Sequence, residues 1–218
     1  MEPAVRDRTD ALRAIVWDMD GTLIDCTMVV PDAYTTAITR LGGPTLTREA
    51  IVAAYGLGPP AAMLAHLLGR ATTDDDVQEY LACLRSGAPA ALPYPGIETT
   101  LERLRGRVGL AVFTGANHAG ALILLEATGL ADHFTVVVGG DEVERQKPAP
   151  DGVLLACRSL GVQPGGAAYV GDSPVDLEAA RSSGARAVAA GWGHLYSSDS
   201  PADLVLERPE DLLELVDA

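Results

Sequence analysis

The chain has 218 residues, of which 48% are hydrophobic and 21% are charged, a composition ordinary for a soluble globular protein. Its formal net charge of -14 argues against general binding to nucleic acid or to an anionic membrane surface, because both partners attract basic surfaces. An anionic substrate would therefore need a local cation to receive it.

The amino-terminal residues 1–13 are polar and do not resemble a signal peptide. No apolar run approaches the ~20 residues of a membrane helix. The three cysteines are widely scattered and lack metal-ligand spacing, which suits free thiols in a reducing compartment. We expect a cytoplasmic protein with no nucleic-acid and no membrane partner.

The first predicted element is a strand at the apolar run 14–16, followed by Trp17-Asp18-Met19-Asp20-Gly21-Thr22-Leu23. Asp18 and Asp20 stand two positions apart, so an extended chain would point both side chains to one side. Gly21 then lets the backbone turn away sharply. Two like charges this close are costly unless a cation or a shared proton relieves them, so the stretch indicates a metal site or acid–base chemistry. An ordinary acidic loop is the alternative.

Residues 26–92 are predicted to form an all-helical insertion. Helical patterns separated by glycine and proline cover 32–41, 47–55, 61–68 and 74–84, and no convincing strand interrupts them. Several prolines and Gly96 then close the segment, as expected of a return linker. We therefore divide the chain into a core of residues 1–25 and 93–218 and an inserted helical domain of residues 26–92.

Helix and strand alternate in the remainder of the chain. Helices are expected at 97–104, 119–127, 151–160 and 177–182 and after Pro209, and strands at 108–113, 134–138, 167–170, 185–189 and 204–206. Continuous apolar strands between helices indicate an α/β fold with a doubly wound, mainly parallel sheet. Ligands of such sheets bind at the carboxyl ends of the strands, where the polar residues of this chain fall.

One of these strand ends carries Thr114, Gly115, Ala116 and Asn117 in front of a helix. A hydroxyl, a glycine that allows close approach and a helix amino terminus together suit the binding of an anion. The alternative is a strand end after which Asn117 is an ordinary helix cap.

Two further sites carry charge. Lys147 is the only lysine among 16 basic residues, which suggests a place where a compact ammonium group is needed, although a solvated surface lysine is the alternative. Asp172 follows another strand, and Asp176 lies one helical turn beyond it; a simple capping role for Asp172 or Ser173 is the alternative. Carboxylates from two strand ends would suit a hard cation such as Mg2+.

The ordered motifs Asp-x-Asp-Gly-Thr, Thr-Gly, Lys-Pro and Gly-Asp-x-x-x-Asp together resemble the haloacid dehalogenase superfamily of phosphatases. The resemblance extends over nearly the whole chain and includes residues 26–92, which resemble the helical cap of that superfamily. Residues 191–194 and 202–205 also resemble the phosphoglycolate phosphatase branch. The resemblance implies a Rossmann-like core, with the cap selecting the leaving group of a small phosphate ester, and with residues 56–60 as its contact with the site.

The resemblance also implies a role for each motif residue. Asp18 would be the nucleophile that forms an aspartyl-phosphate intermediate, and Asp20 would be the general acid and base. The Thr114 hydroxyl and Lys147 would hold the phosphoryl oxygens. Further phosphate contacts would come from Gly21, Gly115, Ala116 and Asn117. Mg2+ would bind to Asp18, to the Asp20 carbonyl and to Asp172, with Asp176 orienting the metal waters or the lysine.

Three other functions are consistent with parts of this pattern. A β-phosphoglucomutase-like enzyme shares the core motifs, but its hinge histidine has no counterpart in residues 26–34. A signalling phosphoacceptor also combines acids, threonine, lysine and Mg2+, but it needs no helical insertion. An inactive binding module would lack the nucleophile or the lysine, and both are present.

The substrate and the oligomeric state are not predicted. Basic side chains of the insertion could recognise a carboxylate or a second phosphate, or could simply be solvated. These are Arg40, Arg48, Arg70, Arg85 and His66.

Overall fold

Six strands within residues 11–217, the part of the chain that this computed structural model describes, form one parallel sheet in the order β5-β4-β1-β6-β7-β8. The strands are β1 (Ala14–Trp17), β4 (Gly109–Phe113), β5 (Val136–Val138), β6 (Ala167–Gly171), β7 (Arg186–Ala190) and β8 (Leu204–Leu206). The predicted doubly wound, mainly parallel α/β fold is confirmed.

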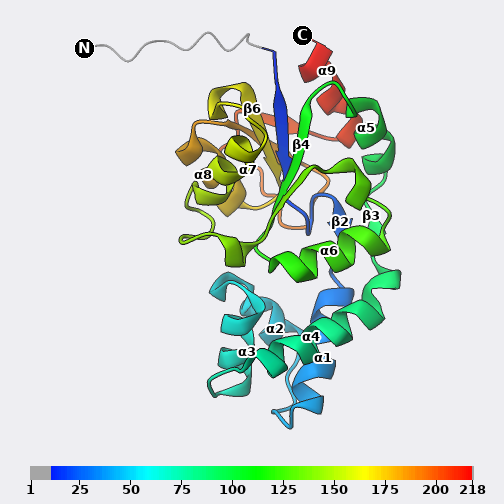
Figure 1. The fold of residues 1–218 in the computed structure, drawn as a ribbon, viewed down its shortest axis with the longest axis vertical. Helices are drawn as coiled ribbons and strands as arrows, with labels where there is room; N and C mark the ends of the chain where they lie inside the picture. The colour runs from blue at the N-terminus through cyan, green and yellow to red at the C-terminus, as the bar shows by residue number, and fades with distance from the viewer. Residues whose placement is uncertain (1–10, 218) are drawn as a thin grey trace, which may run out of the picture.

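Five helices cover the two faces of this sheet (Figure 1). They are α5 (Ile97–Leu104), α6 (His118–Ala127), α7 (Asp151–Ser159), α8 (Pro174–Ser183) and α9 (Leu212–Asp217). Strand side chains alternate between faces, so Ile15 and Trp17 pack into one apolar cluster with α5, α6 and α9, whereas Ala14 and Val16 pack into another with α7 and α8. Both faces are therefore buried, which explains the continuous apolar strands.

The register of the sheet brings three strand ends together. Trp17, the last residue of β1, pairs with Val112 of β4 on one side and with Val170 of β6 on the other. The residues that follow each strand, Asp18 and Thr114 among them, consequently emerge at the same edge of the sheet.

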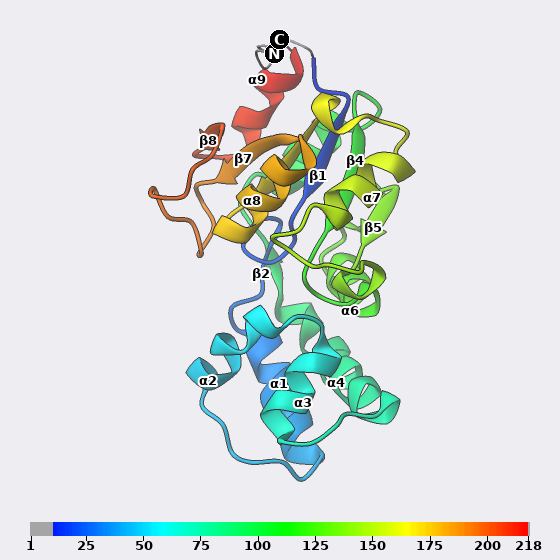
Figure 2. The same ribbon diagram turned by 90° about the vertical axis from the view of Figure 1, so that its left-hand side faces the viewer.

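Four helices between β2 (Ile24–Asp25) and β3 (Leu92–Pro93) form a second lobe, placed beyond this edge and at the opposite end of the molecule from the described termini (Figures 1 and 2). They are α1 (Val29–Arg40), α2 (Arg48–Ala53), α3 (Pro60–Leu68) and α4 (Asp74–Gly87). Thr47 caps α2 as predicted, accepting a hydrogen bond from the Ala50 amide at 3.3 Å. Tyr34 of α1 stacks on Tyr80 of α4 with 4.1 Å between the ring centroids.

A short antiparallel ribbon joins this lobe to the sheet domain. Its strands, β2 (Ile24–Asp25) and β3 (Leu92–Pro93), have two residues each. The expectation that residues 26–92 contain no strand is wrong at Leu92, because two residues are too few for an alternating pattern to show. The division of the chain at residues 26 and 92 stays a prediction, and residues 1–10 and 218, which we assigned to the core, lie outside the described residues.

The remaining regular structure consists of short 3-10 turns. The turns lie at Tyr55–Leu57, Ala88–Ala90, Ala131–His133, Gly140–Glu142, Pro164–Gly166 and Pro209–Asp211. The last of them leads into α9, so the final helix begins with a 3-10 turn at Pro209, as Pro at a first helical position allows.

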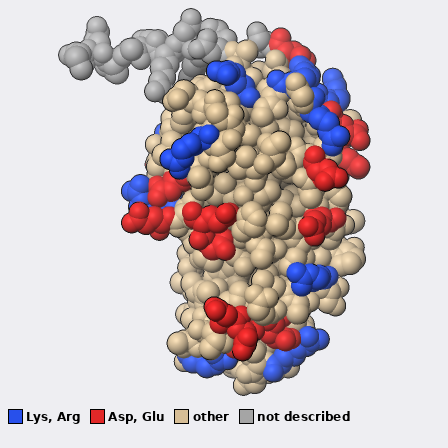
Figure 3. All heavy atoms as spheres, in the orientation of Figure 1, with Lys and Arg blue, Asp and Glu red and all other residues tan. Residues whose placement is uncertain are grey.

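Two surface properties bear on the expected partners. Within residues 11–217, none of the helices combines the length and the apolarity that are needed to cross a bilayer. On the face drawn in Figure 3, acidic side chains lie between or beside the basic ones at both ends of the molecule. This face therefore offers no continuous basic surface for a polyanion among the described residues.

Candidate active site

A cavity of about 380 Å³ lies between the carboxyl edge of the sheet and the helical lobe. Its volume is in the range of small-molecule ligand sites. The sheet domain contributes most of the predicted site residues to its wall: Asp18, Asp20, Thr114, Gly115, Ala116, Lys147 and Asp176. Gly21, Asn117 and Asp172 are not among the described lining residues, although each is next in sequence to one of them.

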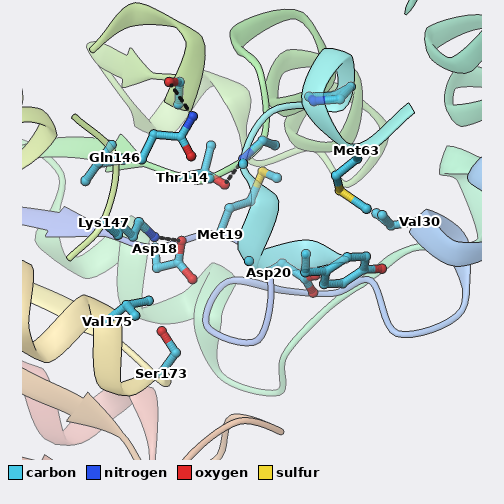
Figure 4. A pocket seen from close by; sticks show the side chains of 18 of the residues that line it. Asp18, Met19, Asp20, Val30, Met63, Thr114, Gln146, Lys147, Ser173 and Val175 are labelled. Atoms are coloured by element: carbon cyan, nitrogen blue, oxygen red, sulfur yellow. Dashed lines mark hydrogen bonds and ion pairs between the residues drawn. The ribbon is translucent and has the colours of Figure 1, made fainter. Parts of the chain in front are cut away.

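Lys147 is buried at the centre of this site, and Figure 4 shows its ammonium group directed at Asp18. The Nζ atom lies 2.5 Å from Asp18 Oδ1 and 2.7 Å from Asp176 Oδ1. Burial alone would lower the pKa of Lys147, but the charges of Asp176 and Asp18 outweigh it and raise the pKa above its ordinary value. Lys147 is therefore a charged group that bridges two carboxylates, and not a solvated surface lysine.

Three carboxylates converge beside this ammonium group. Oxygen atoms of Asp18, Asp172 and Asp176 lie within 4.8 Å of one another, and all three side chains are buried. Burial raises the pKa of Asp18 well above its ordinary value, Asp176 raises it further, and Lys147 lowers it in part. Burial also raises the pKa of Asp172 to about 6. Such a concentration of negative charge favours a bound cation.

Asp172 supplies the observation that tests whether a metal ion fits here. Its Oδ2 atom accepts a hydrogen bond from the Leu195 amide at 2.9 Å, but its Oδ1 atom is buried with no hydrogen-bond partner among the described residues. A buried carboxylate oxygen without a partner is costly, and carboxylate oxygens are the ligands that hard divalent cations prefer. The residues present therefore fit a divalent cation held at Asp18 and Asp172.

Asp18 and Asp20 do not share their surroundings, although they are separated by a single residue. Asp20 Oδ1 accepts a hydrogen bond from the Cys26 amide at 3.2 Å, away from the ammonium group of Lys147. Burial raises the pKa of Asp20, and the charge of His194 lowers it only in part. One carboxylate is thus paired with a cation, and the other is suited to carry a proton.

The turn at Gly21 explains both this separation and the position of Asp172. Gly21 has a φ of +83° and donates its amide hydrogen to Ile24 O at 3.0 Å, which folds the chain back after Asp20. A Cβ atom at Gly21 would lie 2.3 Å from Asp172 Oδ2, and one at Gly193 would lie 2.2 Å from Asp172 Cβ. Glycine at both positions therefore allows the backbone to pack directly against this carboxylate.

The residues after β4 divide into two groups. Thr114, Gly115 and Ala116 reach the cavity wall, with Thr114 Oγ1 accepting a hydrogen bond from the Ala116 amide at 3.2 Å. Asn117 instead caps α6, its side chain accepting a hydrogen bond from the Gly120 amide at 3.2 Å. The structure thus shows Asn117 in the capping arrangement that the sequence left open.

Two residues to which the sequence assigned no role in this site hold Asp176 in place: Ser173, considered only as a helix cap, is the N-cap of α8, and Tyr169 was not singled out. Ser173 donates to Asp176 Oδ2 from its amide at 3.0 Å and from its hydroxyl at 2.5 Å, and Tyr169 donates its hydroxyl hydrogen to Asp176 Oδ1 at 3.1 Å. Tyr169 looks like one more apolar strand residue in the sequence. The only signal was a large polar-tipped side chain in a strand of small residues.

The fold and the site together define an α/β protein with a helical cap, in which strand-end carboxylates and one buried lysine lie at the wall of a cavity. The chain belongs to the haloacid dehalogenase-like hydrolase family, whose family model matches residues 12–184.

Similar proteins match nearly the full length of the chain. A phosphoglycolate phosphatase of Chromobacterium violaceum is 34% identical over 222 residues, covering 94% of this chain and 96% of the relative. An N-acetylmuramic acid 6-phosphate phosphatase of Pseudomonas aeruginosa is 32% identical over 219 residues, covering 94% of this chain and 95% of the relative. The fold is also that of CbbY from Rhodobacter sphaeroides in complex with phosphate, with a TM-score of 0.82 at 24% identity over 95% of this chain and 100% of that one.

Proposed function

We propose that the chain is a Mg2+-dependent phosphatase, similar to phosphoglycolate phosphatases, that hydrolyses a small phosphorylated metabolite in the cytoplasm. The observation that carries the proposal is the buried Lys147, which bridges Asp18 and Asp176 at the wall of the cavity. The phosphatase relatives at 34% and 32% identity support the same reaction. The substrate would be a small-molecule phosphate ester, with neither nucleic acid nor membrane as a partner.

In the first half of the reaction, an Asp18 oxygen attacks phosphorus while the bond from phosphorus to the ester oxygen breaks. Asp20 gives its proton to the departing oxygen, which leaves as the alcohol. Its raised pKa suits this step, because the carboxyl must arrive protonated. Lys147 and the Thr114 hydroxyl hold the phosphoryl oxygens beside Gly115 and Ala116.

In the second half, Asp20 takes a proton from a water molecule that attacks the phosphorus of the aspartyl phosphate. The bond between phosphorus and Asp18 breaks, and this regenerates the carboxylate and releases inorganic phosphate. Asp176 acts as a positioning residue, because it fixes the Lys147 ammonium at 2.7 Å and is itself held by Ser173 and Tyr169.

Asp18, Asp172 and the Asp20 carbonyl would hold the Mg2+ ion. When bound, the ion would supply positive charge that offsets the repulsion between the carboxylates and a phosphate ester. The unpartnered Asp172 oxygen supports this assignment.

The test is hydrolysis of p-nitrophenyl phosphate by the purified protein with Mg2+. We expect turnover that is abolished by Asp18→Asn and by excess EDTA, and that returns when Mg2+ is added back. Asp132→Asn, at an exposed position on a 3-10 turn, is the matched control and should retain full activity. Undiminished turnover by Asp18→Asn, or full activity in excess EDTA, would contradict the proposal.

The same preparation separates hydrolysis from the alternatives. After treatment with acetyl phosphate, a phosphatase should release phosphate within seconds, whereas a signalling phosphoacceptor should accumulate stable phosphoprotein. A phosphomutase would move the phosphoryl group between positions of a sugar phosphate without net release of phosphate.

A further inference from the structure

The cavity has two chemically different ends. On the side of the helical lobe its wall consists of aromatic, thioether and aliphatic side chains, namely Val30, Tyr34, Tyr55, Met63, Tyr80 and Leu84. Figure 4 shows Val30 and Met63 on the side of the cavity away from Lys147 and Asp18, with Asp20 between the two groups. Lys147 is the one cationic side chain among the described lining residues.

Two basic residues of the lobe are paired with carboxylates outside the cavity. Arg40 pairs with Glu79 at 2.9 Å, and Arg70 pairs with Asp76 at 2.7 Å. Figure 3 shows basic side chains at the outer edge of this lobe, next to acidic ones. None of the basic side chains that we considered for anion recognition is among the described lining residues of the cavity.

Arg48 is a third basic residue of the lobe, and its charge acts on Tyr55. Its guanidinium group is nevertheless committed to other partners. It lies 2.5 Å from Asp32 Oδ1 and donates a hydrogen bond to Thr27 O at 3.0 Å. A second anionic group of a substrate would have to compete with the Asp32 carboxylate for this arginine.

Tyr55 lines the cavity and carries a polar group that has no partner among the described residues. It lies on the 3-10 turn Tyr55–Leu57, between α2 and α3, and its hydroxyl oxygen is buried with no hydrogen-bond partner among the described residues. Burial raises the pKa of Tyr55 and the charge of the neighbouring Asp20 raises it further, so the hydroxyl keeps its proton and can donate it. A buried donor of this kind is stabilised when a ligand supplies an acceptor.

We infer that the site prefers phosphate monoesters of an uncharged organic alcohol with an apolar or aromatic face, and that the Tyr55 hydroxyl donates a hydrogen bond to a neutral oxygen of the leaving group. This inference rests on the proposed phosphatase function, which fixes the phosphoryl end at Lys147 and the ester oxygen at Asp20. A leaving group with a carboxylate or a second phosphate would bury its charge against Tyr34, Met63 and Tyr80 without a counter-ion, which is unfavourable.

A preference for neutral esters would distinguish this chain from the relatives that are named for phosphoglycolate. Phosphoglycolate carries a carboxylate on its leaving group, and the lobe offers no free cation to it among the described lining residues. We therefore expect the shared reaction of this family to be directed here to a different, neutral class of ester.

The decisive experiment compares pairs of esters in which only one member carries a carboxylate on its leaving group. For the wild-type protein with Mg2+, kcat/KM should be at least tenfold higher for benzyl phosphate than for 4-carboxybenzyl phosphate, and higher for 2-hydroxyethyl phosphate than for phosphoglycolate. Equal values, or a preference for the carboxylated ester of either pair, would overturn the inference while leaving the phosphatase function intact. Failure to hydrolyse any ester, p-nitrophenyl phosphate included, would instead overturn the proposed function and the inference with it.

Tyr55→Phe tests the hydrogen bond separately. The variant should lower kcat/KM for 2-hydroxyethyl phosphate by about 3- to 10-fold and leave that for ethyl phosphate nearly unchanged, since only the first ester offers a second oxygen. Arg85→Ala, at an exposed position of α4, is the matched control and should change neither value. An equal effect of Tyr55→Phe on both esters would show that the hydroxyl does not contact the leaving group.

Discussion

Replacing Gly21 with alanine should displace the Asp172 carboxylate, because the two residues are in direct contact behind the cavity. The new Cβ atom would lie 2.3 Å from Asp172 Oδ2, whereas ordinary van der Waals contact begins at 3.4 Å. The pair must therefore separate by about 1 Å, and a displacement of that size at a catalytic group costs on the order of 100-fold in rate. The φ of +83° adds about 1–2 kcal/mol of backbone strain.

Gly42→Ala provides a matched control for the strain. Gly42 also has a positive φ, of +70°, but a Cβ atom there would meet nothing within 4 Å. Both variants should lose a similar 1–2 kcal/mol in urea unfolding from the backbone strain alone, roughly as expected for a residue forced into the left-handed region. Only Gly21→Ala should also lose activity and bind Mg2+ more weakly.

The assay is the kcat/KM of p-nitrophenyl phosphate hydrolysis over a Mg2+ titration, measured for both variants under conditions in which they are fully folded. Activity of Gly21→Ala within threefold of the wild type would refute the reasoning, because Asp172 would then tolerate the displacement or would not take part. Equal losses of activity in Gly21→Ala and Gly42→Ala would show that the effect comes from backbone strain and not from the contact between residue 21 and Asp172.

Three further results are expected. Tyr169→Phe should destabilise the protein by about 1–3 kcal/mol in urea unfolding, because it removes a buried hydrogen bond of the hydroxyl, which lies 2.9 Å from Phe113 O and 3.1 Å from Asp176 Oδ1. An unchanged midpoint of unfolding would contradict this. Asp76→Asn should reduce stability at pH 7, because the Arg70 guanidinium holds the pKa of Asp76 below its ordinary value of 3.8. A carboxyl group whose pKa is lowered by folding stabilises the protein at pH values above its pKa in the unfolded chain, and this stabilisation is lost as the pH falls through its pKa in the folded protein. The difference in the free energy of unfolding between wild type and Asp76→Asn should therefore be constant between pH 7 and about pH 5 and should shrink below about pH 4. Unfolding curves at several pH values would show this, and a difference that grew on acidification would be inconsistent with it. Finally, excess Mg2+ should raise the melting temperature of the wild type more than that of Asp172→Asn, and equal shifts would place the ion elsewhere.

Much of the fold was predictable because the sheet is buried on both faces. Strands such as 109–113 are continuous apolar runs that end at a glycine or a polar residue, and the helices between them carry clear amphipathic patterns. The convergence of Asp18, Thr114 and Asp172 also followed from the sequence, since parallel strands present their carboxyl ends at one edge.

The pairings inside the site could not be predicted in the same way. The sequence pointed Asp18 and Asp20 to one side, but the chain turns at Gly21 and gives each carboxylate its own partner. Tyr169 contacts Asp176 only because of the distance between β6 and α8, which no local pattern encodes. The two residues are seven positions apart, and their contact depends on how α8 packs against β6 and not on periodicity.

The β2–β3 ribbon has a consequence for how such a protein can change. The chain leaves the sheet domain at Asp25 and returns at Leu92, and these two residues are paired across the ribbon. A change in the length of the segment between these two residues should therefore cost little in loop closure, since the entropy of closing a loop grows only slowly with its length. We expect this pair of positions to accept the lobe of another family member as a graft. The reaction chemistry and the recognition of the leaving group would then be separable parts of one gene, free to be recombined.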